Sequence, residues 1–440
     1  MIPDTIVAPA TPPGYGGVSV IRISGDISKD LVKKLCNRRS FFSNRKPTLA
    51  SVYGGDGEAI DDAVVTFFKG PRSYTGEDVL EISCHGNPVI VDKIVSTVCN
   101  FGARIADPGE FTKRAFLNGK LDLVQAESVS NLIGSRSFEA ASVNSKILSG
   151  SLSKKINALK ESIVGALAEL EFEFDVSENE LLTPGLIGKS NKSINNNILK
   201  CENLIDSYSG GRLLNRGARV VIYGKPNVGK STLLNALLEK DRAITSELPG
   251  TTRDTVDADI VLGGVPVTLI DTAGIRSADS GVESAGIKRS FDDIKNADLL
   301  INVTTNESDL VNKTKTTDTI VVFNKIDLFA PPNNLTGVVP VSALLGSGVL
   351  DLKNIITMKL VSKNKSHSGV VLTTARQKTA ITACNNSLKM SLTHLNKNTP
   401  ELEIVAFELR KSLDHIDTLL GKTTVEDILN KVFSGFCVGK

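Results

Sequence analysis

The sequence predicts a multidomain protein with an N-terminal α+β domain, an α-helical domain, and an α/β domain inserted into the helical one. Three observations predict this fold class. Short strand patterns separated by Gly- and Pro-rich turns fill the first part of the chain. Apolar stripes at helical spacing follow and return near the C-terminus, and strands alternate with helices between them. A length of 440 residues is enough for about two to four domains.

The N-terminal domain is expected to span residues 1–118. Apolar and β-branched runs predict four strands, at Thr5–Ala8, Val18–Ile23, Ala63–Phe68 and Val79–Ile82. One helix is predicted, at about Pro88–Cys99. Strands with a single helix indicate a compact α+β domain.

The helical domain is expected in two parts, residues 119–213 and 369–440, because each part carries apolar residues at steps of three and four. The stripes consist of Leu148, Leu152, Ile156, Leu159, Ile163, Leu167 and Leu170, and of Leu402, Val405, Leu409, Leu413, Ile416 and Leu420. The segment Asp175–Asn197, rich in Asn and Ser, is expected to interrupt the helices. A short helical stretch at Ile198–Ser207 is then expected to end before Gly210–Gly211.

The inserted domain, residues 214–368, is predicted to form a doubly wound parallel sheet. Its first strand, Val220–Tyr223, is followed by Gly224–Ser231, which fits the phosphate-loop pattern G-x-x-x-x-G-K-[ST], and then by a helix pattern. Glycines let backbone N–H groups face phosphate oxygens, Lys230 reaches the β- and γ-phosphates, and Ser231 offers its hydroxyl to Mg²⁺. The order strand, loop, helix therefore predicts a nucleoside triphosphate site.

Four later motifs narrow the ligand to GTP. They follow the phosphate loop in the order that a GTPase needs: Gly250–Asp254, Asp271–Gly274, Asn324–Asp327 and Ser342–Leu344. Thr252 and Asp271 suit the Mg²⁺ shell. The Asp327 carboxylate can accept from the N1–H and N2–H₂ donors of guanine, which adenine lacks, and the last motif can offer a backbone N–H to O6. The predicted GTP contacts are Asn227, Val228, Gly229, Lys230, Ser231, Thr232, Ser246, Thr251, Thr252, Asp271, Thr272, Ala273, Gly274, Asn324, Lys325, Asp327, Ser342 and Ala343.

Ile275 follows Gly274 where Ras-type enzymes carry the glutamine that orients the attacking water. An apolar side chain cannot orient water. The chain is therefore either a slow GTPase that needs an external activator, or an enzyme in which another residue supplies this function. Glu283 is the acidic candidate for that catalytic role.

The composition indicates an ordinary globular protein, with 41% hydrophobic residues and a formal net charge of +2. Such a balance neither requires nor excludes nucleic acid. The six cysteines include no C-x-x-C pair, which favours reduced thiols in a cytoplasmic protein. No apolar run has the length of a membrane span, so no membrane association is expected.

Several motifs together resemble the MnmE (TrmE) family of tRNA-modification GTPases. The resemblance covers essentially the whole chain and rests on Ala10–Gly14, Arg22–Gly25, Ser73–Asp78, Pro108–Thr112, Arg114–Asn118, Lys120–Leu123, Gly250–Asp254 and Phe436–Lys440. It implies a homodimer whose folate-binding N-terminal domain takes 5-formyl- or methylene-tetrahydrofolate as one-carbon donor. The positions that match the folate contacts are Arg22, Glu81, Lys120 and Lys440.

The resemblance also implies K⁺ activation of the GTPase. The positions that match the ion's ligands are Asn227, Ser246, Leu248 and Thr251, and Glu283 matches the residue that orients the water. The family acts with a flavoprotein partner, MnmG (GidA), in a heterotetramer, and modifies the wobble uridine (position 34) of tRNA at C5. Two alternatives stay open: a ribosome-assembly GTPase, and a folate-dependent transferase that GTP only regulates. Cys437 is either catalytic or a structural thiol, and Cys84–His85 is either a metal ligand pair or a loop contact.

Overall fold

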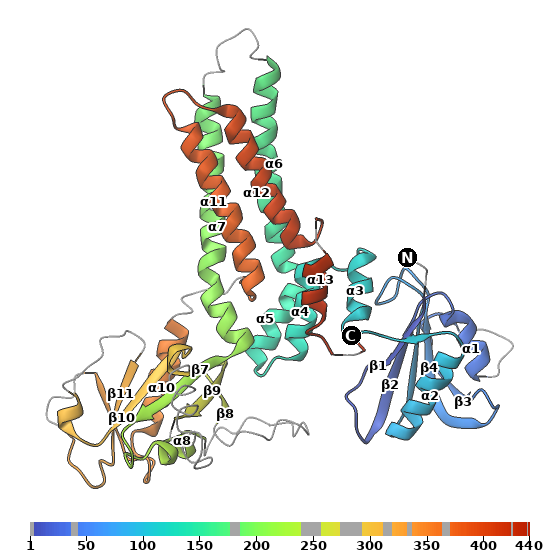
Figure 1. Ribbon diagram of the computed structural model, residues 1–440, viewed down its shortest axis with the longest axis horizontal. Coiled ribbons are helices and arrows are strands. Elements are labelled where there is room, and N and C mark those ends of the chain that lie inside the picture. The colour runs from blue at the N-terminus through green and yellow to red at the C-terminus, as the bar shows by residue number, and fades with distance from the viewer. Residues whose placement is uncertain are drawn as a thin grey trace. The chain divides into compact units, whose positions relative to one another are not determined.

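A computed structural model describes residues 4–36, 43–176, 185–238, 257–272, 293–310, 319–331, 337–362, 370–423, 426–437 and 439–440 (Figure 1). The chain divides into two compact units. Unit 1 comprises Met1–Ser130, Ile147–Lys160 and Leu413–Lys440. Unit 2 comprises Asn131–Lys146 and Glu161–Ser412.

Unit 1 is built on a six-stranded sheet with the strand order β3-β4-β5-β2-β1-β6. Its neighbouring strands are antiparallel except for β1 and β6, which are parallel. The strands are β1 (Ile6–Pro9), β2 (Gly16–Ser24), β3 (Thr48–Tyr53), β4 (Ala59–Phe68), β5 (Val79–Gly86) and β6 (Arg104–Ile105). The four strands predicted from the sequence are confirmed as β1, β2, β4 and β5, of which the last three are longer than expected. Strands β3 and β6 were not predicted.

The one helix predicted in this region is confirmed as α2 (Pro88–Asn100). The described residues of the region contain two further helices that were not predicted, α1 (Ser28–Cys36) and α3 (Glu110–Leu117). Helix α1 is only nine residues long and half of it is charged or polar, so its apolar periodicity is short. It forms because Leu31, Val32 and Leu35 are buried in the same core as Ile94 and Val98 of α2. Tertiary packing thus decides this element.

Seven helices, from 8 to 31 residues long, form the parts of the described chain that were predicted to be helical. They are α4 (Leu123–Ile133), α5 (Phe138–Leu148), α6 (Ser151–Val176), α7 (Leu186–Arg216), α11 (Ala375–Leu395), α12 (Leu402–Leu420) and α13 (Glu426–Phe433). Most of the two predicted stripes is fully buried, including Leu152, Ile163, Val405 and Ile416. The prediction that these stripes face a core is therefore confirmed.

Helix α7 corrects two predictions. It begins at Leu186, inside the Asn/Ser-rich segment expected to interrupt the helices, and it continues through Gly210–Gly211. The polar segment is helical because Ile194 and Ile198 start a buried stripe within it. Gly211 does not end the helix: a Cβ atom there would lie 2.1 Å from the carbonyl oxygen of Leu372, so this glycine permits a close approach of backbones.

Unit 2 contains a second six-stranded sheet, with the order β12-β11-β10-β7-β9-β8. All neighbours are parallel except β8 and β9, so the prediction of a parallel sheet holds for five strands and fails at the β8 edge. The strands are β7 (Ala218–Gly224), β8 (Asp257–Leu262), β9 (Val265–Asp271), β10 (Leu299–Thr304), β11 (Thr319–Asn324) and β12 (Val338–Val341).

The core of this sheet includes side chains of α8 (Lys230–Leu238) and α10 (Val349–Ser362). A short 3₁₀ helix, η2 (Glu307–Leu310), follows β10. Only Gly217 separates the end of α7 from the start of β7, so one continuous segment runs from the long helix into the sheet (Figure 1). None of the helices in the described ranges is long and apolar enough to cross a membrane.

Two glycines of α7 provide a matched test of the close approach at Leu372. Gly211→Ala should lower the free energy of unfolding by about 1–3 kcal/mol, because the added methyl group overlaps a backbone oxygen. Gly188→Ala should raise it by about 0.5–1 kcal/mol, because a Cβ atom there meets nothing within 4 Å and alanine favours helix. Thermal unfolding followed by circular dichroism compares the variants. Equal stability of Gly211→Ala and the wild type would contradict the tight contact.

Candidate functional site

The phosphate loop leaves the carboxyl end of β7, a strand paired on both sides. Val220 and Val221 are buried and pair in parallel with β9 and β10. At the end of the strand, Gly224 has a φ of 154°, and a Cβ atom there would lie 2.2 Å from the carbonyl oxygen of Val303. Only glycine allows β10 to approach this closely. The sheet therefore fixes the point from which the loop departs.

Left-handed residues then curl the loop toward α8. Asn227 has a φ of 64°, and Gly229 has a φ of 91°. Asparagine is one of the few non-glycine residues that adopt this conformation readily. A Cβ atom on Gly229 would lie 2.5 Å from Nδ2 of Asn324, so glycine is required here by space as well as by φ. Turns of this kind expose successive backbone N–H groups to an anion.

Lys230 is buried at the first position of α8, and its ammonium group bends back over the loop. Its Nζ donates to the carbonyl oxygens of Gly224, at 3.1 Å, and Lys225, at 2.8 Å. These contacts hold the positive charge across the loop. A phosphate group in the loop would meet this charge together with the N-terminus of α8.

Ser231 and Asp271 bring two oxygen ligands together beside the loop. The Ser231 hydroxyl donates to Oδ2 of Asp271 at 2.6 Å, and Asp271 is buried at the end of β9. Thr272 follows, and both its N–H and its hydroxyl donate to the carbonyl oxygen of Ile222 in β7, at 3.2 Å each. A hydroxyl and a carboxylate are the oxygen donors that Mg²⁺ prefers, so the residues present fit this ion.

The Asn324 side chain links the phosphate loop to the last predicted motif. It is buried, and its Nδ2 donates to the carbonyl oxygen of Val228 at 2.8 Å while its Oδ1 accepts from the Ala343 N–H at 3.0 Å. Lys325, with a φ of 63°, donates from Nζ to the carbonyl oxygen of Asn227 at 2.8 Å. Two side chains of the N-K-x-D motif therefore donate to carbonyl oxygens of the phosphate loop and fix its position.

Asp327 is oriented by the motif that begins at Ser342, whose hydroxyl donates to Oδ1 of the carboxylate at 2.5 Å. The Ser342 N–H donates to the carbonyl oxygen of Ser347, and the Ala343 N–H serves Asn324. The Leu344 N–H forms no hydrogen bond within the described residues. Of the three N–H groups in the motif, this one is open to a ligand.

The structure thus brings most predicted nucleotide contacts to one edge of the unit 2 sheet. Those that it describes are Asn227, Val228, Gly229, Lys230, Ser231, Thr232, Asp271, Thr272, Asn324, Lys325, Asp327, Ser342 and Ala343. The others lie outside the described residues, and their roles stay predictions: Ser246, Leu248, Thr251, Thr252, Ala273, Gly274 and Glu283.

A second cluster of predicted residues lies on the unit 1 sheet. Arg22 of β2 and Glu81 of β5 are cross-strand partners, and Nε of Arg22 donates to Oε1 of Glu81 at 2.9 Å. The Arg22 guanidinium lies 5.0 Å from the ring centre of Tyr74 and 5.8 Å from that of Phe111. The aromatic residues were not predicted as site residues, although both belong to the motifs that carry the resemblance. Aromatic faces stabilise and orient the cation.

Lys440 joins this cluster from the C-terminal segment. Gly439, with a φ of 95°, approaches β1 so closely that a Cβ atom would lie 2.0 Å from the carbonyl oxygen of Pro9. Burial, with the positive charge of Arg22, lowers the pKa of the Lys440 ammonium, against the opposing effect of Glu81. Three of the four predicted folate contacts are therefore close in space.

Lys120, the fourth, lies at the turn after β4. Its Nζ donates to the carbonyl oxygen of Pro71 at 3.0 Å. This turn is tied to the rest of unit 1 by buried groups: the Ser24 hydroxyl is hydrogen-bonded to Thr75 and Glu77. Lys120 is thus attached to the same segment, residues 70–78, that carries Tyr74.

A charged network braces α3 in the same unit. Burial would raise the pKa of Glu110, but hydrogen bonds from Arg104 and Arg114 outweigh burial and lower it. Arg114 also donates to Asp4 at 2.7 Å and to Glu77 at 3.2 Å. These pairs connect the N-terminus, α3 and the 70–78 segment. These residues were not predicted as site residues, and their contacts indicate that they stabilise the fold of unit 1.

The open choice at Cys84–His85 is settled in favour of local contacts. Cys84 is buried and its thiol donates to the carbonyl oxygen of Ser19, while Nδ1 of His85 lies 2.7 Å from Asp61. Among the residues that the structure describes, no cluster of three His, Cys, Asp or Glu side chains could hold a metal ion. Cys437 is exposed, and both roles considered for it stay open.

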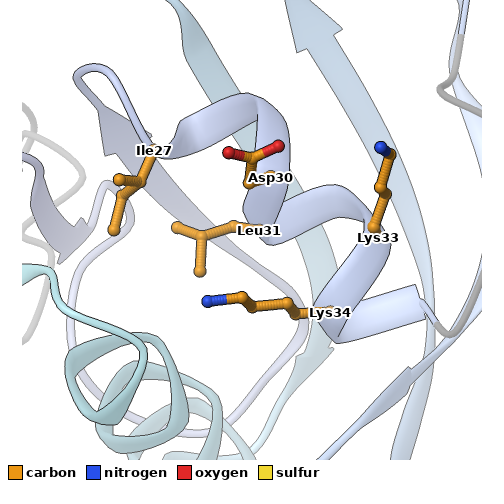
Figure 2. Close-up of a pocket in the computed structure, with 5 residues that line it drawn as sticks. All are labelled: Ile27, Asp30, Leu31, Lys33 and Lys34. Atoms are coloured by element: carbon orange, nitrogen blue, oxygen red, sulfur yellow. The ribbon is translucent and has the colours of Figure 1, made fainter.

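A pocket of about 250 Å³ lies beside α1 (Figure 2). Its lining consists of Ile27, Asp30, Leu31, Lys33 and Lys34. It contains none of the predicted site residues. The Lys34 ammonium lies 5.2 Å from the ring centre of Phe101, and this cation–π contact helps to orient the Lys34 side chain.

The phosphate loop, the Ser231–Asp271 pair and the N-K-x-D motif at one sheet edge define the class of P-loop GTPases. Comparisons with known proteins give the family. The family model for the "GTP-binding protein TrmE N-terminus" matches residues 5–120, and that for the "MnmE helical domain" matches residues 123–437. The chain belongs to the MnmE family of tRNA modification GTPases.

Two relatives illustrate the match. The tRNA modification GTPase MnmE of Pseudothermotoga lettingae is 39% identical over 455 residues, which covers 100% of both chains. That of Aquifex aeolicus is 38% identical over 449 residues, which covers 99% of this chain and 100% of the relative. Among solved structures, the FeoB G domain of Methanococcus jannaschii is 22% identical, with a TM-score of 0.25, over 32% of this chain and 97% of that one. A likeness of this size adds nothing to the assignment.

Replacing Asp327 tests the base-recognition site. Asp327→Asn should weaken GTP binding by about 10- to 100-fold, because the amide presents a donor where the carboxylate accepts two. Xanthosine triphosphate should gain affinity, because its base carries a carbonyl oxygen in place of the amino group. Asp351→Asn, an exposed carboxylate on α10, serves as the control. Titration with fluorescent nucleotides measures both, and unchanged selectivity would exclude Asp327 from base recognition.

Proposed function

We propose that this tRNA modification GTPase uses a K⁺-stimulated nucleotide cycle to drive folate-dependent modification of the wobble uridine of tRNA at C5. The observation that carries the proposal is the presence of two separate sites in one chain. One is the nucleotide edge around Lys230 and Asn324, and the other is the cluster of Arg22, Glu81 and Lys440. A GTPase that acted only as a switch would have no use for the second cluster.

At the nucleotide edge, GTP would lie with its phosphates in the loop and against Lys230. Ser231 and Thr252 would hold Mg²⁺, with Asp271 in its outer shell, and the ion would offset charge on the β- and γ-phosphates. Asp327 would accept from the guanine N1–H and N2–H₂ groups. The open N–H of Leu344 suits O6, because the Ala343 N–H is already donated to Asn324.

Hydrolysis would depend on residues from the loop and from the segments beyond it. Glu283 would orient the attacking water, since Ile275 cannot. Asn227 would contribute an oxygen to K⁺, and Ser246, Leu248 and Thr251 would complete the ion's shell. A cation beside the phosphates offsets the charge that develops in the transition state, as an arginine finger does. The left-handed φ of Asn227 supports this role, because a non-glycine residue rarely adopts this conformation.

At the second site, a reduced folate such as 5-formyl- or methylene-tetrahydrofolate would bind as one-carbon donor. Glu81 suits the N–H donors of a pterin, and the cations of Arg22, Lys120 and Lys440 suit carboxylates. We also propose that two copies pair through this domain. The lowered pKa of Lys440 supports a ligand role, since a partly desolvated ammonium binds an anion more strongly.

The division of labour follows the proposed domains, residues 1–118 for folate and dimerisation, 214–368 for GTP, and 119–213 with 369–440 as the helical domain. A flavoprotein of the MnmG (GidA) kind would act with this chain in a heterotetramer, and together they would install an aminomethyl or carboxymethylaminomethyl group at C5. A tRNA substrate assigns this work to the cytoplasm. Communication between the sites would require the inserted domain to move as nucleotide is hydrolysed.

Potassium dependence is the first test. Replacing K⁺ by Na⁺ should lower GTP turnover at least about tenfold. Asn227→Gly should abolish the difference between the two ions while it retains nucleotide binding, because glycine keeps the left-handed φ and removes the side-chain carboxamide with its oxygen. Asn195→Ala, an exposed asparagine on α7, is the control. Equal turnover of the wild type in both salts would refute the cation assignment.

Wobble nucleosides test the whole proposal. In a strain that lacks this gene, mass spectrometry should find the modified wobble uridine replaced by unmodified uridine, and the wild-type gene should restore it. A gene that encodes Glu81→Gln should not restore it, because the amide no longer accepts two pterin donors, although its GTPase should persist. If the deletion strain still carried the modified wobble uridine at the wild-type level, the proposal would be defeated and a ribosome-assembly role favoured.

A further inference from the structure

Four basic residues lie at or against the turn that follows β4, at Gly70–Pro71. We call them the basic turn: Arg45, Lys69, Arg72 and Lys120. Nη2 of Arg45 donates to the carbonyl oxygen of Arg72 at 2.5 Å, and Nζ of Lys120 donates to that of Pro71 at 3.0 Å. The Lys69 N–H donates to Oδ1 of Asn44, beside Arg45, at 2.9 Å. All four residues are exposed.

Among the described residues, none of these four cations has an acidic partner, since no ion pair includes Arg45, Lys69, Arg72 or Lys120. Asp78 lies at the turn, but its Oδ1 accepts from the Gly70 N–H. Elsewhere in the same unit the pattern is the opposite, because Arg104 and Arg114 are both paired with Asp4 and Glu110. Four clustered like charges repel one another, so the basic turn favours an anion with several charges.

The basic turn is continuous with the cluster of Arg22, Glu81 and Lys440. Tyr74, four residues after Gly70, lies under the Arg22 guanidinium. Gly76 follows, and a Cβ atom there would lie 3.4 Å from Cγ of Lys120. Nδ2 of Asn118 donates to the carbonyl oxygen of Thr75 at 2.8 Å, which fixes Lys120 beside this segment. Residues 74–76 therefore connect the cluster to Lys120, whose ammonium group contacts the turn at Pro71.

We propose that the basic turn binds the oligo-γ-glutamate tail of a reduced folate, so that the preferred one-carbon donor is a polyglutamate. The inference rests on the proposed folate site. Each γ-linked glutamyl unit adds one free α-carboxylate, and such a chain is the extended polyanion that a row of unpaired Arg and Lys side chains fits. Nucleic acid is the weaker candidate, because the basic turn is small and leads directly out of the ligand cluster.

Binding of 5-formyltetrahydrofolate as monoglutamate and as pentaglutamate tests the proposal on the full-length protein. Exposed ion pairs are individually weak, so three or four together should make the pentaglutamate bind about tenfold more tightly at low salt. The gain should shrink as salt is raised. Lys69→Gln/Arg72→Gln should remove most of the gain and leave monoglutamate affinity within about twofold, since neither side chain is in the folate cluster.

Lys93→Gln is the matched control. This exposed lysine of α2 pairs with Asp56. Asp56 precedes β4 and Lys69 follows β4, so Asp56 and Lys69 lie about 30 Å apart along the strand. The control should keep the pentaglutamate preference. Equal affinity for the two folates would overturn the inference but leave the folate site standing, whereas no binding of either would defeat both. A double variant that loses tRNA affinity and keeps the pentaglutamate preference would assign the basic turn to RNA instead.

Discussion

The nucleotide edge depends on one buried amide, the side chain of Asn324. It satisfies the carbonyl oxygen of Val228 in the phosphate loop and the N–H of Ala343 in the base-recognition motif, from a strand that neither motif belongs to. Loss of this side chain would leave both groups without partners, at a cost of about 1–3 kcal/mol each. Because Gly229 has no Cβ atom, the Asn324 amide can lie directly against it. The proposed phosphate site and the proposed base site are therefore connected through a single side chain.

The folate-type cluster depends in the same way on parts of the chain that are distant in sequence. Arg22 and Glu81 meet because β2 and β5 are neighbours in register, and Lys440 reaches them because Gly439 lies directly against Pro9. The 70–78 segment brings Tyr74 to Arg22 and holds Lys120 on its outer side. The arrangement combines two aromatic rings beside Arg22, a carboxylate and several cations, a set of groups that suits a planar heterocycle with an acidic tail.

Sequence patterns identified motifs that the structure brings to one sheet edge, because each motif is local: a strand end and the residues that follow it are contiguous. They failed where burial is decided by distant partners. Gly210–Gly211 has the signature of a helix end, yet α7 continues because Gly211 faces the Leu372 carbonyl. Tyr74 and Phe111 gave no sign of a role until Arg22 was placed over them. Likewise, the isolated basic residues near Gly70 gain meaning only from their mutual contacts.

The junction at Gly217 has a mechanical consequence. Helix α7 has 31 residues and is therefore about 46 Å long, and only one residue separates it from the strand that ends in the phosphate loop. Arg136 stiffens the joint, since it donates to the carbonyl oxygen of Arg216. Such a rod is a lever: a tilt of about 5° at the strand would displace its far end by about 4 Å. A shift of about 1 Å at the phosphate loop, such as loss of a γ-phosphate would cause, would thereby become a larger displacement at the far end of α7.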